Sequence, residues 1–172
     1  KRPVPEKNSF EHITYRCHNQ KFLFNLPRNW DGVVSWTNSL SLFFDVSVFH
    51  VLFMSNHLHM LLNTGSGSFS KAMSYTFSGM ARYLNFENNK KNQFFGGRYY
   101  ATEIRNPRHL MNCIRYIYQN PVRAGIVSSV EAYPYSSLPF YLGQGNPGLS
   151  VRSDPYTQQL FDQGLKGYDE WI

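Results

Sequence analysis

The chain has 172 residues, enough for one domain with a hydrophobic core; 42% of them are hydrophobic and 17% are aromatic. No uninterrupted apolar run reaches the roughly 18 residues of a membrane span, and two distant cysteines, Cys17 and Cys113, argue against a disulfide scaffold or a zinc finger. The net charge of +6 is concentrated in residues 46–130, where nine basic residues against two acids leave +7. We therefore expect a soluble cytoplasmic protein with a polyanionic partner and no membrane.

The first 45 residues predict a strand followed by a helix. Residues 10–17 alternate and are rich in strand formers, and the single histidine among them, His12, is interpreted as structural. Pro27 is typical of a helix start, and apolar residues at 30, 33 and 34 share one face of that helix. The pattern leaves its far end, around residues 40–44, open.

A long apolar run over residues 46–62 predicts two strands joined by a tight Ser-Asn turn. Strand alternation places Leu58 and Met60 on one face and His57 and His59 together on the other. Two imidazoles at this spacing can bind one cation, although an isolated pair of this kind is more often an ordinary core or surface feature.

The middle of the chain predicts a helix and a further strand. Apolar residues recur at spacings of three and four from Phe69 to Leu84, with Ser68 or Ser70 as the N-cap. Lys71 and Arg82 lie off this stripe, where they face phosphate or solvent. A polar turn at 88–92 precedes strand character over 94–104, and the glycine pair at 96–97 indicates a bulge or a close backbone approach.

Asn106-Pro107 predicts the start of another helix, which we expect Pro121 to stop. At about 100° per residue, Tyr116 and Asn120 lie one turn apart on the same side of this helix, whereas Tyr118 lies on nearly the opposite flank. The remaining residues, 131–172, carry a net charge of −3 and are rich in Pro, Gly, Ser and Tyr. We expect them to wrap around the domain or to be partly extended.

Three blocks stand in order: MSNHLHMLL (54–62), FFGGRYY (94–100) and RYIYQNPVRAGIV (115–127). Together they resemble the single-tyrosine HUH transposases, most closely the REP-associated tyrosine transposase branch. The resemblance implies an α+β, ferredoxin-like catalytic domain over residues 1–130, with a central antiparallel sheet, helices on one face of it, and an irregular acidic tail over residues 131–172.

The resemblance also implies roles for particular residues. His57 and His59 correspond to the metal-binding pair, Asn120 to the third ligand and Tyr116 to the nucleophile, with Mg²⁺ as the ion and Mn²⁺ as a substitute. Tyr118 stands where the family commonly has a histidine. Only Tyr116 shares a side of the helix with Asn120, which favours Tyr116 as the nucleophile.

The implied activity is cleavage and rejoining of single-stranded DNA near hairpins through a 5′-phosphotyrosine, by a nucleoid-associated monomer or homodimer without a nucleotide cofactor. Phosphate contacts are expected from five cations: Arg98, Arg105, Lys71, Arg82 and Arg115. Two alternatives stay open: a domesticated hairpin-binding protein with little or no transposition, and a metal-dependent nuclease that uses water. A replication initiator with the same site would normally carry further domains.

Overall fold

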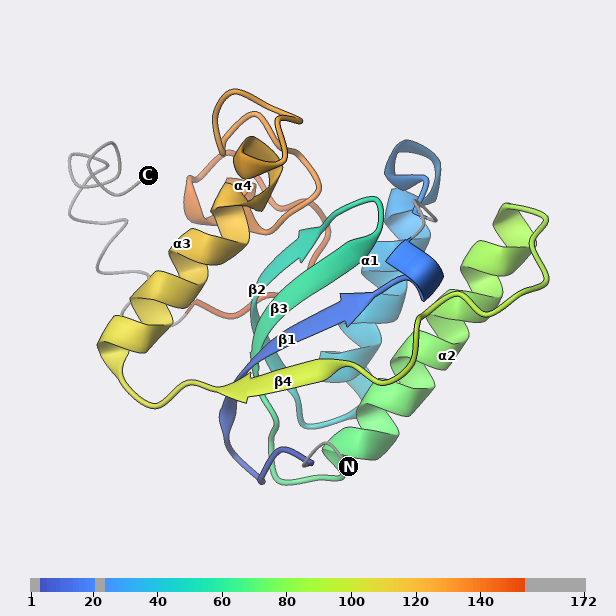
Figure 1. The fold of residues 1–172 in the computed structure, drawn as a ribbon. Helices are drawn as coiled ribbons and strands as arrows, with labels where there is room; N and C mark the ends of the chain where they lie inside the picture. Colours follow the sequence, from blue (N-terminus) through green and yellow to red (C-terminus); the bar gives the residue numbers. More distant parts are fainter. Residues whose placement is uncertain (1–3, 21–23, 154–172) are drawn as a thin grey trace.

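The computed structural model describes residues 4–20 and 24–153 (Figure 1). The elements follow one another as β1 (Phe10–Arg16), a short 3-10 helix η1 (His18–Gln20), α1 (Leu26–Phe43), β2 (Ser47–Phe53), β3 (His57–Asn63), α2 (Phe69–Glu87), β4 (Tyr100–Glu103), α3 (Pro107–Arg123) and α4 (Leu138–Tyr141). Within these residues, no helix combines the length and apolar character needed to cross a membrane.

The four strands form a single antiparallel sheet in the order β2-β3-β1-β4. Helix α1 connects β1 to β2 and helix α2 connects β3 to β4, so each helix links two parallel strands that are separated by an antiparallel one. These are two interlocked split βαβ units. The predicted α+β fold with a central antiparallel sheet is confirmed, and the apolar run over residues 46–62 forms the β2–β3 hairpin as expected.

Helices cover both faces of this sheet, so the expectation of helices on one face is wrong (Figure 1). Leu58 and Met60 pack in a core with α1 and α2. Leu61 points the other way and packs in a second core with Ile114 and Ile117 of α3. Because β3 carries apolar residues on both of its faces, a helix is needed on each side to bury them.

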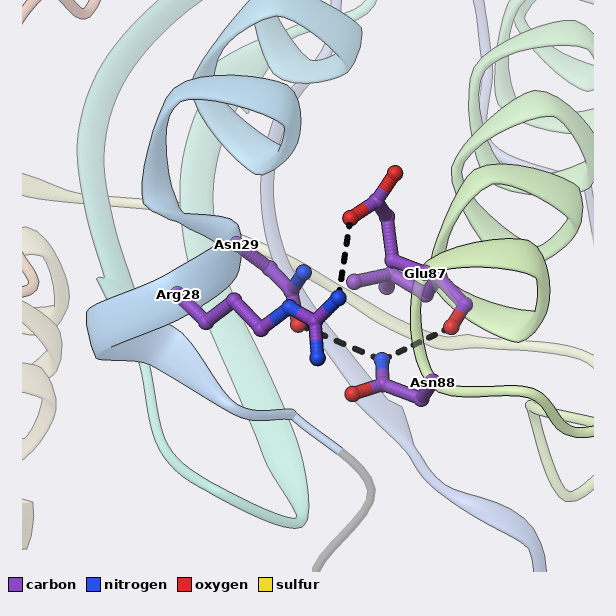
Figure 2. A network of polar contacts seen from close by, with 5 residues as sticks. Arg28, Asn29, Glu87 and Asn88 are labelled. Atoms are coloured by element: carbon purple, nitrogen blue, oxygen red, sulfur yellow. Dashed lines mark hydrogen bonds and ion pairs between the residues drawn. The ribbon is translucent and has the colours of Figure 1, made fainter.

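Helices α1 and α2 are tied together where α1 begins and α2 ends (Figure 2). The Arg28 guanidinium lies 3.7 Å from the Glu87 carboxylate. Beside this pair, Asn88 Nδ2 donates to Asn29 Oδ1 at 3.2 Å and to the Leu84 carbonyl at 2.7 Å. The second of these bonds occupies a carbonyl of the last helical turn, so Asn88 both ends α2 and holds it against α1.

The apolar stripe predicted for α2 is buried at every position: Phe69, Met73, Phe77, Met80 and Leu84. Ser68 occupies the N-cap position, although its side chain makes no capping hydrogen bond. On the face of the sheet opposite α3, this stripe and α1 enclose the larger of the two cores.

The strand predicted over residues 94–104 is shorter than expected, because only Tyr100–Glu103 forms regular β4. Phe95 instead makes an isolated bridge with Cys17. A side chain at position 96 would place its Cβ 3.2 Å from the Cys17 carbonyl oxygen, and Gly97 adopts a φ of +125°. The close backbone approach predicted from the glycine pair is therefore confirmed.

Helix α3 begins as predicted but continues past the expected stop. Asn106 caps it by accepting a hydrogen bond from the His109 N–H at 2.8 Å, and Pro107 is its first residue. The prediction that Pro121 ends the helix is wrong, since α3 extends to Arg123. Proline removes one donor to the Ile117 carbonyl, and Asn120 Nδ2 approaches that oxygen at 3.4 Å while donating to the Tyr116 carbonyl at 2.7 Å. This side-chain amide offsets the missing backbone bond.

Residues 131–153 pack first against the α3 face, then pass the edge strand β2 and reach α1, where Asn38 Nδ2 donates to the Gly148 carbonyl at 2.8 Å. Tyr133 is buried and its hydroxyl donates to the Phe53 carbonyl at 2.7 Å. Val151 makes a parallel bridge with Val48. The rest of the segment expected to form a tail, residues 154–172, lies outside the described residues.

Candidate active site

His57 and His59 lie on β3, in the interior of the sheet, and both side chains are on the face that α3 covers. Their ring centroids are 5.0 Å apart and the ring planes are nearly perpendicular, at 88°. The antiparallel register places Thr14 of β1 opposite His59 and Arg16 opposite His57. Strand alternation therefore brings the two imidazoles to one spot, with β1 side chains beside them.

His57 is held by two asparagines. Its Nδ1 lies 2.6 Å from Asn56 Oδ1, which can only accept, so Nδ1 carries the proton and Nε2 keeps its lone pair. Burial lowers the pKa of His57 and nearby Arg16 lowers it further, while a hydrogen bond with the Asn120 side chain opposes these effects. The ring is therefore neutral at physiological pH, the form in which an imidazole binds a metal.

His59 is almost completely buried, and its two ring nitrogens have very different surroundings. Nδ1 lies 3.0 Å from His12 Nε2 and 3.2 Å from the Thr14 hydroxyl, whereas Nε2 is buried without a hydrogen-bond partner. Burial, helped by repulsion from His12, His57 and Arg16, lowers the pKa of His59 to about 2. His59 is thus neutral, and one of its nitrogens has an unmet binding capacity.

His12 was expected to be structural, and the structure places it within the site instead. Its ring stacks on that of His59 at a centroid distance of 5.2 Å. Burial, together with His109, lowers the pKa of His12 to about 4. The alternation of residues 10–17 indicates that His12 and Thr14 share a face, but only the pairing of β1 with β3 shows that this is the face of the histidine pair.

Tyr116 of α3 covers the buried His59 and the half-buried His12. Its ring stands edge-on to His59 at a centroid distance of 5.4 Å and to His12 at 6.0 Å. The side chain stays 41% exposed, so its hydroxyl-bearing ring is open to a ligand from solvent. The Arg123 guanidinium carbon lies 5.9 Å from the centre of the same ring. Tyr116 and Asn120 therefore reach the histidine pair from one side of α3, as their spacing predicts.

Tyr118 lies elsewhere, buried in the second core. Its hydroxyl lies 2.8 Å from His50 Nδ1 and 3.0 Å from Ser137 Oγ. Tyr118 therefore lies on nearly the opposite flank of α3 from Tyr116, away from the His57–His59 pair. The geometry therefore assigns packing and hydrogen bonding to Tyr118 and leaves Tyr116 beside the histidines.

The donor set suits one divalent cation. Among residues 4–20 and 24–153, no three His, Cys, Asp or Glu side chains form a possible metal site, so a third protein ligand has to be of another type. Asn120 offers an amide beside His57, and Nε2 of His59 is a buried ring nitrogen without a hydrogen-bond partner. Two neutral imidazoles and an amide oxygen would suit Mn²⁺ better than Mg²⁺, which prefers oxygen ligands.

Two of the five predicted DNA-binding cations, Arg82 and Arg98, line a shared cavity of about 640 Å³ between α2 and the loop before β4. Arg98 also lines a neighbouring cavity of about 600 Å³ with Arg16 and Tyr100, next to the histidine pair. The other three cations are dispersed: Lys71 is exposed on α2, Arg105 is exposed and paired with Glu103 at 3.3 Å, and Arg115 is half-buried on α3. Arg16 was not predicted, although it lies within the alternating stretch of residues 10–17 and ends β1.

Known proteins are similar to this chain in sequence and in fold. A provisionally named REP-associated tyrosine transposase of Haemophilus influenzae is 27% identical over 124 aligned positions, covering 60% of this chain and 70% of that protein. The solved structure of a REP-associated tyrosine transposase bound to a REP hairpin superposes with a TM-score of 0.68 at 16% identity, covering 90% of this chain and 92% of the other. The chain resembles the REP-associated tyrosine transposases. No protein-family model matches the sequence.

The likeness to REP-associated tyrosine transposases supports the family resemblance drawn from the three sequence blocks. At 16% identity the structural match establishes the fold. The roles of His57, His59, Tyr116 and Asn120 stay predictions, which rest on the geometry described above.

Proposed function

We propose that this protein is a metal-dependent transposase-type endonuclease that cleaves single-stranded DNA beside hairpins and rejoins the strands through a tyrosine–DNA bond. The observation that carries the proposal is the position of Tyr116, whose half-exposed ring packs edge-on against His59 at 5.4 Å. One chain supplies all four groups at this spot: a tyrosine, two neutral histidines and an amide. A tyrosine nucleophile beside groups that can hold a metal ion is an arrangement that supports phosphodiester cleavage.

His57 and His59 would hold the ion, and Asn120 would add the third protein ligand. When bound, Mg²⁺ (or Mn²⁺ as a substitute) polarises the scissile phosphate and offsets the charge that builds up on it. All three ligands are neutral, which leaves the positive charge of the ion available to the phosphate. Asn120 is held in place by the bond from its Nδ2 to the Tyr116 carbonyl, so ligand and nucleophile are positioned by the same helical turn.

The covalent step is an exchange of one phosphodiester bond for another. The Tyr116 oxygen forms a bond to phosphorus, the bond from phosphorus to the 3′ oxygen breaks, and the tyrosine proton is in net terms transferred to that oxygen. The products are a 5′-phosphotyrosine and a free 3′-hydroxyl. Because the new bond is also a phosphodiester, the 3′-hydroxyl of another strand can displace the tyrosine without ATP or any other nucleotide.

The DNA approaches along the cavity that Arg16, Arg98 and Tyr100 line beside the histidine pair. Arginines suit phosphate contacts, and the exposed ring of Tyr100 is suited to base stacking. The excess positive charge of residues 46–130 favours a nucleic acid partner. The hairpin part of the substrate is proposed by similarity, because the related structure holds a REP hairpin.

The test mixes the full chain with Mn²⁺ or Mg²⁺ and a labelled set of single-stranded hairpin oligonucleotides, followed by a denaturing gel. We expect label to migrate with the protein, and to be absent with EDTA and in Tyr116→Phe. Tyr118→Phe is the matched control and should still form the adduct. Cleaved DNA without an adduct would mean a hydrolytic nuclease, and hairpin binding without cleavage would mean a binding protein; either result refutes the proposal.

A further inference from the structure

We infer that His12 is a positioning residue for the metal site, which accepts the Nδ1 proton of His59 and thereby turns the lone pair of His59 Nε2 toward the ion. The inference rests on the metal site proposed above and assigns a role to a residue outside the ligand set. It starts from the 3.0 Å contact between His12 Nε2 and His59 Nδ1, two nitrogens on neighbouring strands.

A contact between two neutral imidazole nitrogens requires that one donates and the other accepts. If His12 donated, His59 would carry its proton on Nε2, and this N–H would be buried without an acceptor. If His59 donates from Nδ1, its Nε2 instead holds a lone pair, which can bind a cation. The orphaned Nε2 therefore favours His59 as the donor and His12 as the acceptor, with the Thr14 hydroxyl at 3.2 Å as a second acceptor of the same proton.

His57 follows the same rule with a different acceptor. Its Nδ1 is 2.6 Å from Asn56 Oδ1, an acceptor that favours the Nδ1–H tautomer, and the Asn120 side chain is its second hydrogen-bond partner. Both histidines of the pair would then present Nε2, each oriented by a second residue bonded to Nδ1. Outer partners of this kind commonly raise metal affinity about 10- to 100-fold, because they hold both the tautomer and the ring orientation.

Packing shows that His12 is placed for this task and has little freedom to leave it. Its ring stacks on His59, with planes 23° apart, and Tyr116 closes over it edge-on at 6.0 Å. The nitrogen that contacts His59 is Nε2, the outermost atom of the side chain. A glutamine at position 12 would place its Oε1 in the same region as an acceptor, whereas a phenylalanine would fill the space without one.

The test compares wild-type full chain with His12→Phe and His12→Gln, and has two readouts that do not depend on DNA cleavage. Mn²⁺ affinity is measured by calorimetry, and the His59 tautomer by long-range ¹H–¹⁵N NMR of the metal-free protein, with His59→Gln to assign the signals. We expect the Nδ1–H tautomer in the wild type, Mn²⁺ affinity about 10- to 100-fold weaker in His12→Phe, and affinity within a few-fold of wild type in His12→Gln.

The inference is overturned if wild-type His59 carries its proton on Nε2, or if folded His12→Phe binds Mn²⁺ as tightly as the wild type. Since the tautomer is measured in the wild type, a variant that fails to fold does not leave the question undecided. If the wild type binds no Mn²⁺, the metal dependence of the proposed function fails, and the tautomer alone then decides whether His12 orients His59.

Discussion

Tyr116 and Tyr118 are two residues apart on α3, and removing one hydroxyl from each should have opposite consequences. Tyr118→Phe is expected to lower stability and leave DNA attachment intact. The Tyr118 hydroxyl is buried between His50 Nδ1 at 2.8 Å and Ser137 Oγ at 3.0 Å, so the substitution removes two buried hydrogen bonds. Ser137 keeps its bond from the Val51 N–H at 2.9 Å, so the loss falls mainly on His50.

The size of the effect follows from these contacts. Each buried neutral bond contributes about 1 kcal/mol, so the free energy of unfolding should fall by about 2 kcal/mol. For a chain of this size, that corresponds to a drop in Tm of roughly 4–8 °C. Tyr116→Phe removes a hydroxyl from a side chain that is 41% exposed, and its effect on the free energy of unfolding should stay within about 0.5 kcal/mol.

The assay measures urea unfolding of both variants by circular dichroism and covalent DNA attachment on a denaturing gel. Tyr116→Phe should lose the adduct at unchanged stability, and Tyr118→Phe should keep it at reduced stability. If folded Tyr118→Phe forms no adduct while Tyr116→Phe still does, the nucleophile has been assigned to the wrong side of α3.

Three further predictions concern the site as a whole. His57→Ala and His59→Ala should each abolish metal-dependent cleavage, measured with Mn²⁺ on the same gel; undiminished activity in both would exclude the metal site. A mixture of Tyr116→Phe and His59→Ala should stay inactive, because Tyr116 packs on His59 of its own chain; recovered cleavage would show that the site is shared between chains. Arg98→Ala should weaken hairpin binding and reduce the slope of log K against log salt by about 1, and Arg105→Ala, already paired with Glu103, should change it less; equal slopes would argue against the Arg98 cavity as the DNA path.

Features that depend only on residues close together in the sequence could be predicted. Alternation alone places His57 and His59 on one face, and Asn106-Pro107 marks the start of α3 to within a residue. The helical spacing of Tyr116 and Asn120 likewise predicts that both reach the same side. Each of these predictions depends on contacts within about one turn or one hairpin.

Features that depend on distant segments could not be predicted in this way. His12 lies 47 residues before its partner His59, and nothing within residues 10–17 shows which strand will lie beside them. The two-sided cover of the sheet follows from Leu61, whose apolar side chain needs α3. Pro121 was misread because the rule for proline considers only the backbone, whereas Asn120 supplies a side-chain donor.

The Asn120 amide should therefore have two roles: its Nδ2 supports α3 and its oxygen binds the ion. The variant Asn120→Asp separates these roles. Its Nδ2 donates to the Tyr116 carbonyl at 2.7 Å and lies 3.4 Å from that of Ile117. Aspartate has no donor, so its carboxylate would face two carbonyl oxygens and the metal-free protein should lose about 1–3 kcal/mol of unfolding free energy.

Mn²⁺ should stabilise Asn120→Asp more than the wild type, because a carboxylate is a stronger ligand than an amide for a hard cation. A ligand at 100 times its Kd stabilises a folded protein by about 2.7 kcal/mol, so tighter binding appears directly as a larger rise in Tm. We expect Mn²⁺ to raise the Tm of Asn120→Asp more than that of the wild type, as measured by thermal unfolding at matched Mn²⁺ concentrations. Equal stability without metal would show that Nδ2 does not support α3, and a smaller rise with Mn²⁺ than in the wild type would show that position 120 does not contact the ion.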